Sequence, residues 1–304
     1  MFGNKGVVLM ERPNVSWDNV AGLDSVKQTL REAVILPLKY PNLFTGRTRR
    51  PWAGILLYGP PGTGKSDLIK ALANEAADTS FFYVSSRKIS SKWSDGENLL
   101  QTLFTAAREH KNSMIFIDEV DALCGNCSEY ESSRRIKTEF LVQMGGENRN
   151  VQKRICVPLP EAEVRSEIFK IQLGKAVHSL TEENFTELGK ITNGFSGFDI
   201  SVVVKEAMLK PVRKVQTATK FRKVEEACNK DPLESDTVND LLIPCSSEAQ
   251  GAIEMSWEDL PKNKLLETNV SMGDMLESIA NYKPTVTDDD LRKVEEFKRD
   301  FVTL

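Results

Sequence analysis

The segment from Gly59 to Ser66 reads Gly-Pro-Pro-Gly-Thr-Gly-Lys-Ser and matches the phosphate-binding loop pattern G-x-x-x-x-G-K-[ST] at every fixed position. The apolar run 54–58 before it predicts a strand, and 67–77 after it predicts a helix. In this arrangement, backbone N–H groups and a helix N-terminus converge on an anionic phosphate chain. We therefore expect a nucleoside triphosphate site formed by Gly59, Pro60, Pro61, Gly62, Thr63, Gly64, Lys65, Ser66 and the adjoining Asp67.

Within this loop the side chains of Lys65 and Ser66 have distinct expected roles. Lys65 would reach the β- and γ-phosphates, and the Ser66 hydroxyl would bind Mg²⁺. A chance glycine-rich turn is the alternative interpretation, but the complete pattern between a strand and a helix argues against it. The pattern predicts ATP and Mg²⁺ as cofactors.

A second apolar run, 114–117, ends in the carboxylates Asp118 and Glu119. The run predicts a buried parallel strand, and ligands of open α/β sheets bind at the carboxyl ends of such strands. Asp118 would hold Mg²⁺ through water, and Glu119 would orient or deprotonate an attacking water. By itself this pattern is weak, but its place about 50 residues after a phosphate-binding loop strengthens it.

Composition excludes several classes of function. The chain has 304 residues, with 40 Lys and Arg against 44 Asp and Glu, so no basic field favours nucleic acid. No apolar stretch reaches about 18 residues and no signal segment opens the chain, so we expect a soluble, non-secreted protein. Its 5 cysteines form no even disulfide framework, which favours the reducing cytoplasm.

Alternating strands and helices up to about residue 160 predict an α/β fold with a doubly wound parallel sheet. Further predicted elements are a strand at 81–84 and helices at 23–36 (ending near Pro37), 98–108, 133–144, 161–173, 181–192, 199–215, 272–280 and 288–301. Pro211 is expected to kink or end the helix 199–215, and strands are expected around 255–257. The expected domains are an N-terminal arm 1–16, a large ATPase domain 17–160, a helical lid 161–225, a small β insertion 226–271 and closing helices 272–304.

The phosphate-binding loop, the acidic strand end and the segments 17–23 and 194–200 together resemble the AAA ATPases. Within that superfamily, the runs 91–93, 134–144, 211–216 and 283–286 resemble the family of vacuolar protein sorting factor 4, of the meiotic clade. The resemblance extends from about Val7 to Phe301. It implies a hexameric ring, homo- or hetero-oligomeric, that hydrolyses ATP to disassemble ESCRT-III polymers by threading, acting in the cytoplasm and recruited to endosomal membranes by its partners.

The resemblance also implies roles for residues outside the loop. Asp18, Val20, Ala21 and Gly22 match the segment that surrounds the adenine, and Gly197 and Phe198 match the start of the lid helix that faces the nucleotide. Lys92 and Trp93 match the first pore loop, which grips an extended polypeptide; a Trp packed against its own domain is the alternative. The β insertion is a possible contact for an adaptor.

The chain departs from the family pattern after Met144, where about 20 residues are absent before Lys153. The family has there a core strand ending in a sensor Asn, followed by a helix and arginine fingers. Loss of such a finger lowers the rate of phosphoryl transfer by about 10³–10⁵, and loss of the strand would leave a hole in the sheet. The pore loop is one residue shorter than the pattern, and we expect the N-terminal microtubule-interacting-and-trafficking domain to be lacking.

Two other functions remain open. One is a nucleotide-binding, hydrolysis-deficient subunit or regulator of such rings, which the gap after Met144 favours. The other is a microtubule-severing protein related to katanin or spastin. The segment from about 231 to 272 argues against severing, because it resembles the small β domain of the sorting factor.

Overall fold

The computed structural model describes residues 8–9, 13–46, 49–91, 96–124, 131–144, 151–224, 241–245, 251–261, 265–266 and 269–302. The chain divides into two compact units. Unit 1 comprises Met1–Leu159 and Asp288–Leu304, and unit 2 comprises Pro160–Thr287. Each unit is described by itself below.

Unit 1 alternates strands with helices, as the sequence predicts. Its described elements are β1 (Val8–Leu9), the 3-10 helix η1 (Trp17–Asn19), α1 (Asp24–Leu30), the π-helical η2 (Arg31–Ile35), α2 (Leu36–Lys39), η3 (Pro41–Phe44), β2 (Ile55–Tyr58), α3 (Lys65–Glu75), β3 (Ser80–Ser85), α4 (Ser86–Ser91), α5 (Gly96–Glu109), β4 (Ser113–Asp118), α6 (Asp121–Cys124), α7 (Glu131–Met144), β5 (Lys153–Cys156) and α12 (Asp288–Val302).

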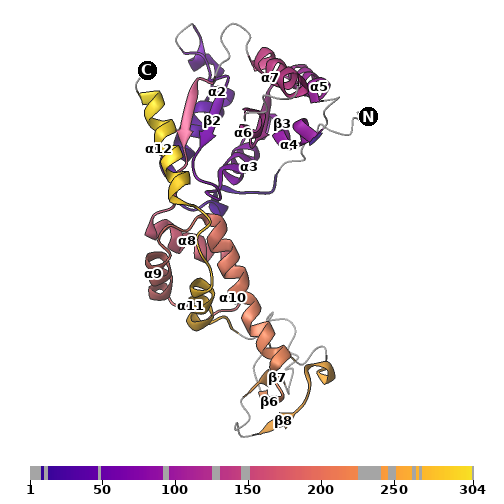
Figure 1. Cartoon of the computed structure of the whole chain (residues 1–304), viewed down its shortest axis with the longest axis vertical. Helices are drawn as coiled ribbons and strands as arrows, with labels where there is room; N and C mark the ends of the chain where they lie inside the picture. The colour runs from indigo at the N-terminus through magenta and orange to yellow at the C-terminus, as the bar shows by residue number, and fades with distance from the viewer. Residues whose placement is uncertain are drawn as a thin grey trace. The chain divides into compact units, whose positions relative to one another are not determined.

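The strands of unit 1 form two sheets (Figure 1). β2 pairs in parallel with β5, and β3 pairs in parallel with β4. The short β1 lies antiparallel on the other edge of β3, in the segment 1–16 that was expected to be an N-terminal arm. Among the described residues no strand joins β2 to β4, so the P-loop strand and the acidic strand stand in separate sheets. This split is what we expect if the chain lacks a core strand after Met144.

Helices cover both faces of the β3–β4 sheet, which is the doubly wound arrangement. Successive residues of a strand point to opposite faces, and here Phe81 packs in a core with α1 and α3, whereas Phe82 packs in a core with α5 and α7. Both side chains are buried. Figure 1 shows α5 and α7 side by side next to β3. Burial on both faces explains why β3 reads as a continuous apolar run.

The first long helix, predicted to end near Pro37, continues through that proline and ends two residues later, at Lys39. α1 passes into the π-helical turn η2 and then into α2, which contains Pro37 near its start and ends at Lys39. The N–H of Leu36 bonds to the carbonyl of Arg31, five residues earlier. Pro37 follows this π-helical turn inside a helical run that continues on both sides of it, and it has no N–H to donate.

Unit 2 is a helical core joined to a small antiparallel sheet. Its described elements are α8 (Ala162–Leu173), α9 (Glu182–Ile191), α10 (Gly197–Thr217), β6 (Lys220–Val224), β7 (Leu241–Pro244), β8 (Ala252–Glu254), η4 (Trp257–Asp259) and α11 (Met272–Ala280). Phe169, Leu188 and Met275 are fully buried where α8, α9, α10 and α11 pack together. α10 runs from this core to the sheet, whose strand order is β7-β6-β8 (Figure 1).

Several boundaries in this region differ from the expected ones. Pro211 does not end α10, which continues to Thr217; Ala207, Pro211 and Val215 are all buried, and their packing offsets the lost backbone bond. The strands lie at β6, β7 and β8, and 257–259 is a 3-10 turn, not a strand. β6 begins at Lys220, before the expected start of the insertion. The closing helices belong to different units, α11 to unit 2 and α12 to unit 1.

Candidate functional site

The P-loop connects the end of β2 to the start of α3. Gly62 and Gly64 have positive φ values of 73° and 82°, which glycine adopts without strain. Gly59, at φ 144°, lies so close to β5 that a Cβ would come within 2.1 Å of the Val157 carbonyl oxygen. Thr63 is buried, and its hydroxyl donates to the carbonyl of Pro60 over 3.0 Å. The loop backbone is therefore tightly curled above the N-terminus of α3.

Lys65 points back into this loop. Its Nζ donates to the carbonyls of Pro60 and Gly59, at 2.6 and 3.0 Å. Burial lowers the pKa of Lys65, while the carboxylates of Asp118 and Asp121 act in the opposite direction. The ammonium group thus occupies the concave side of the loop, where it is held by neutral oxygens that an anionic ligand would outcompete.

The other expected residues, Pro60, Pro61, Gly62 and Asp67, differ in their exposure. Pro61 and Gly62 are exposed, and Pro60 is buried. Asp67 forms an exposed ion pair with Lys70, three residues later on α3, at 3.0 Å. The partner of Asp67 is therefore a residue of its own helix and not one of the P-loop.

The carboxylate of Asp118, at the end of β4, accepts hydrogen bonds from residues of α3 and β3. Its Oδ2 accepts hydrogen bonds from the Ser66 hydroxyl at 3.2 Å and from the Tyr83 hydroxyl at 3.0 Å. Its Oδ1 accepts from the N–H of Glu119 at 3.0 Å. Burial, followed by the bond to Asp118, raises the pKa of Tyr83 to about 12, so the phenol remains a donor at neutral pH. The structure thus brings Ser66 and Asp118 together.

Glu119 is held in an unusual backbone conformation. Its φ is 54°, a left-handed value that costs a non-glycine residue about 1 kcal/mol. The buried Ser86 hydroxyl donates to its carbonyl oxygen, and its carboxylate pairs with Arg87 at 2.6 Å. The Glu119 side chain is 44% exposed, so water reaches this carboxylate.

Tyr83, Ser86 and Arg87 were not among the residues expected from the sequence. All three come from the end of β3 or the start of α4, and they contact Asp118 or Glu119 only because β3 lies beside β4. In the sequence, Tyr83 reads as one more member of the apolar run 81–84. One signal could have found Tyr83. Alternate residues of a strand share a face of the sheet, so Tyr83 lies on the same face as Ser85, which pairs with Asp118.

The segment expected to surround the adenine packs against α3. Val20 is buried in the core formed with α1 and α3, and its carbonyl accepts from Lys27 Nζ at 2.6 Å. The indole of Trp17 donates to Glu75, at the end of α3, over 2.7 Å. The carboxylate of Asp18 accepts from the Ser16 hydroxyl, and Ala21 and Gly22 are half-buried. The segment 17–22 therefore packs against α3, the same helix that the P-loop leads into.

The remaining expected residues lie in unit 2 or outside the described residues. Gly197 and Phe198 form the first turn of α10 in unit 2, where the Phe198 side chain is exposed. The turn is fixed by the capping residue Ser196, which exchanges hydrogen bonds with Asp199. Lys92 and Trp93 lie outside the described residues.

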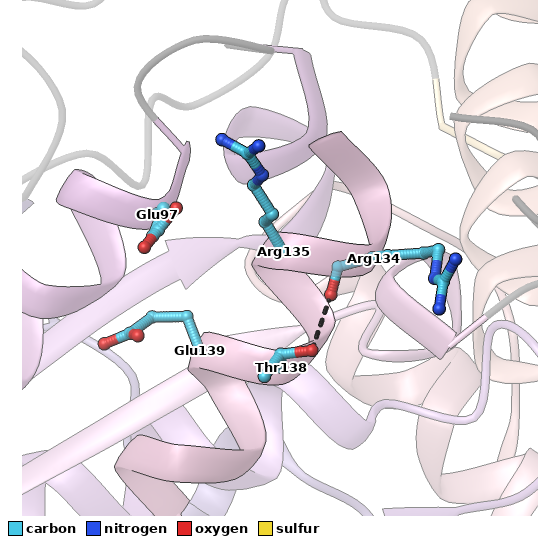
Figure 2. Close-up of a pocket in the computed structure, with 5 residues that line it drawn as sticks. All are labelled: Glu97, Arg134, Arg135, Thr138 and Glu139. Carbon is cyan, nitrogen blue, oxygen red and sulfur yellow. Dashed lines mark hydrogen bonds between the residues drawn. The ribbon is translucent and has the colours of Figure 1, made fainter. Parts of the chain in front are cut away.

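A separate hollow lies between the start of α5 and the middle of α7 (Figure 2). It is lined by Glu97, Arg134, Arg135, Thr138 and Glu139. Figure 2 shows the two guanidinium groups pointing in different directions, so they do not converge on one anion. The Thr138 hydroxyl donates to the carbonyl of Arg134 at 2.9 Å, an ordinary bond within a helix. This hollow adds no ligand to the site at Asp118.

No helix in the described part of the chain is both long enough and apolar enough to cross a membrane.

Comparisons with known proteins agree with this architecture. The model of the AAA family, "ATPase family associated with various cellular activities", matches residues 55–189, and that of the "Vps4 C terminal oligomerisation domain" matches 242–301. A crystal structure of the FIGL-1 AAA domain in complex with ADP superposes with a TM-score of 0.72, at 31% identity, covering 98% of this chain and 94% of that one.

Curated relatives are similar over nearly the whole chain. Mouse vacuolar protein sorting-associated protein 4B is 52% identical over 98% of this chain and 72% of its own length. Human vacuolar protein sorting-associated protein 4A is 50% identical over 97% of this chain and 73% of its own. The mouse alignment is 323 positions long, but 98% of 304 residues is about 298, so about 25 positions hold no residue of this chain. With this identity and the fold described above, the chain belongs to the Vps4 family of AAA ATPases.

Proposed function

We propose that the chain binds ATP and Mg²⁺ at the P-loop of unit 1. The observation that carries this proposal is the contact between Ser66 and Asp118, which joins the two halves of a phosphate and metal site. Backbone N–H groups from Gly62 to Ser66 would hold the phosphates, and Lys65 would exchange its loop carbonyls for phosphate oxygens. The upstream segment containing Asp18, Val20, Ala21 and Gly22 and the α10 start at Gly197 and Phe198 would contact the nucleoside.

The oxygen donors at Ser66 and Asp118 suit Mg²⁺, which prefers hard ligands and keeps several waters while binding substrate phosphates. When bound, Mg²⁺ neutralises charge that develops on the phosphates. Glu119 is the residue that would orient or deprotonate the attacking water. Its carboxylate now pairs with Arg87, so this role requires Glu119 to turn away from Arg87.

We further propose that the chain acts in a ring that couples ATP hydrolysis to the threading of ESCRT-III polypeptides. Membership of the Vps4 family supports this proposal, as does the match to an oligomerisation domain. A hexamer would place Lys92 and Trp93 in its pore, and the sheet formed by β6, β7 and β8 is a candidate contact for an adaptor. Action at endosomal membranes would then depend on protein partners.

A second candidate function is a nucleotide-binding subunit that hydrolyses ATP poorly and joins or regulates active rings. One structural observation favours it: no described strand stands between β2 and β4, where the family has its sensor strand. Without the sensor and the arginine fingers, the transition state loses groups that stabilise its charge. Severing of microtubules is less well supported, because the match to the Vps4 oligomerisation domain, over residues 242–301, takes in β8, α11 and nearly all of α12.

Steady-state phosphate release separates these functions. The purified chain is compared with Glu119→Gln and with an intact family member, each with and without an ESCRT-III polypeptide. Turnover about 10³-fold or more below that of the intact member is the outcome expected for the hydrolysis-deficient subunit. Turnover within tenfold of the intact member, abolished in Glu119→Gln, would instead show that the ring works without the missing segment. If the chain binds no nucleotide, both functions are excluded.

A further inference from the structure

The pairing of β3 with β4 places a tyrosine next to the acidic strand end. Ser85 pairs with Asp118 and Tyr83 pairs with Phe116. Because alternate residues of a strand share a face, Tyr83 lies on the same face of the sheet as Asp118. The ring of Tyr83 packs at 5.5 Å from that of Phe116, and its hydroxyl reaches Asp118 Oδ2 at 3.0 Å. The position of this hydroxyl is therefore set by strand register and by packing.

Three donors fix the carboxylate of Asp118, and each comes from a different element or turn. The Ser66 hydroxyl belongs to α3, the Tyr83 hydroxyl to β3 and the N–H of Glu119 to the turn after β4. Two of these bonds share Oδ2 and the third uses Oδ1. A carboxylate bound on both oxygens has little freedom to rotate, so its orientation is set before any ligand arrives.

This arrangement also determines what Ser66 offers to a cation. Its hydroxyl has one hydrogen, which is directed at Asp118, so its oxygen lone pairs remain for a metal. The Ser66–Asp118 bond needs Asp118 to keep its present orientation. Tyr83 is the donor on Oδ2 that comes from the sheet, and it shares that oxygen with Ser66.

We propose that Tyr83 is a positioning residue for the Mg²⁺ half of the nucleotide site, where its hydroxyl holds Asp118 in the orientation that Ser66 and a metal-bound water require. The inference rests on the nucleotide site proposed above. Groups that hydrogen-bond to metal ligands orient them, and removing such a group typically lowers metal affinity by about 10–100-fold. Tyr83 should therefore matter for the effect of Mg²⁺ on nucleotide binding and not for nucleotide binding without metal.

The substitution Tyr83→Phe tests this inference, because it removes the hydroxyl and keeps the ring that packs against Phe116. Tyr58→Phe is a matched control: Tyr58 ends β2, its ring packs against Phe297 at 4.9 Å, and its hydroxyl bonds to Cys156, not to a carboxylate of the site. Ser66→Ala is the reference for a lost Mg²⁺ partner. Circular dichroism and melting temperature establish that each variant folds.

Affinity for a non-hydrolysable ATP analogue is measured by calorimetry with saturating Mg²⁺ and with EDTA. We expect Tyr83→Phe to retain the parent affinity in EDTA and to lose about tenfold or more of the gain that Mg²⁺ confers, whereas Tyr58→Phe retains that gain. An equal gain in Tyr83→Phe and the parent would overturn the inference, and so would an equal loss of affinity in both buffers. A parent that binds the analogue but gains nothing from Mg²⁺ overturns this inference and the Mg²⁺ half of the proposed site, while nucleotide binding at the P-loop stands. A parent that binds no analogue overturns the proposed function as well.

Discussion

The hydroxyl of Ser66 donates to a carboxylate oxygen of Asp118 over 3.2 Å, although 52 residues separate them in the sequence. This bond joins the first turn of α3 to the end of β4. It forms even though, among the described residues, β2 and β4 belong to separate sheets. The two halves of the site are thus held together through α3, whose apolar face packs against β2 and against β3 and β4.

Gly59→Ala should destabilise unit 1 strongly. The new Cβ would meet the Val157 carbonyl oxygen at 2.1 Å, and the φ of 144° is unfavourable for alanine. Gly46→Ala is the matched control, since Gly46 has φ 94° but open space around the added carbon. In urea denaturation we expect a loss of about 1 kcal/mol for Gly46→Ala and a clearly larger loss for Gly59→Ala. Equal losses would show that β5 yields to the added methyl group.

Ser86→Ala should lower the free energy of unfolding more than Arg87→Ala, although both residues contact Glu119. The Ser86 hydroxyl is buried and bonds to the Glu119 carbonyl, so its loss should lower the free energy of unfolding by about 1–2 kcal/mol. Arg87 is 76% exposed, and exposed ion pairs contribute little. Its loss should change the free energy of unfolding by less than about 0.5 kcal/mol. A larger effect of Arg87→Ala in chemical denaturation would mean that the ion pair supports the fold.

The sequence predicts local elements well where a motif or a period specifies them. The loop 59–66 and the strand ending at Asp118 were found because each is a continuous pattern with its own chemistry. Neither of the two helices ends at its proline: the first continues to Lys39 and α10 continues to Thr217. Pro37 lies just after a π-helical turn, and Pro211 lies in a helix stabilised by burial, so packing rather than local propensity decides both.

The contacts of Tyr83, Ser86 and Arg87 could not be read from the chain in the same way. They depend on which residue of β3 lies opposite which residue of β4, and register is a property of the folded sheet. The assignment of α12 to unit 1 has a similar origin. Its sequence is amphipathic, as expected for a closing helix. The ring contact that joins it to β2, however, is between Tyr58 and Phe297, which lie far apart in the chain.

Asp199 should make unit 2 sensitive to acid. It is fully buried, and its oxygens accept from the backbone and side chain of Ser196 and of Thr285, and from the Tyr282 hydroxyl. Burial alone would raise the pKa of Asp199, but these hydrogen bonds outweigh it and hold the pKa below its ordinary value. Because the folded pKa is lowered, its stabilisation is complete above the unfolded pKa of about 3.9 and is lost as the pH falls below that value.

Asp199→Asn should lower the free energy of unfolding of unit 2 at neutral pH by about 3 kcal/mol and remove this part of the acid sensitivity. Glu187→Gln, at an exposed position on α9, is the control. The measurement is denaturation across the acidic range, followed by a probe in unit 2. A variant as stable as the parent at neutral pH would contradict the role of Asp199.

Trp93→Ala should leave nucleotide binding unchanged and weaken the binding of an ESCRT-III peptide to a reconstituted ring, because a large flat side chain can hold varied sequences by apolar contact. Trp257→Ala, an exposed tryptophan in unit 2, is the control. A melting temperature lowered by several degrees, with peptide binding retained, would identify Trp93 as a packing residue and remove it from the pore.

The affinity of the Lys65→Ala variant for ATP tests the central claim most directly. Lys65 lies on the concave side of the P-loop, bonded to the carbonyls of Gly59 and Pro60, and a charge-assisted bond to phosphate is worth about 1.5–3 kcal/mol. Calorimetry with Mg²⁺ should therefore show affinity reduced by about 10-fold to 100-fold relative to the parent, with Lys39→Ala, an exposed lysine on α2, unchanged. Equal affinity in Lys65→Ala and the parent would contradict nucleotide binding at this loop.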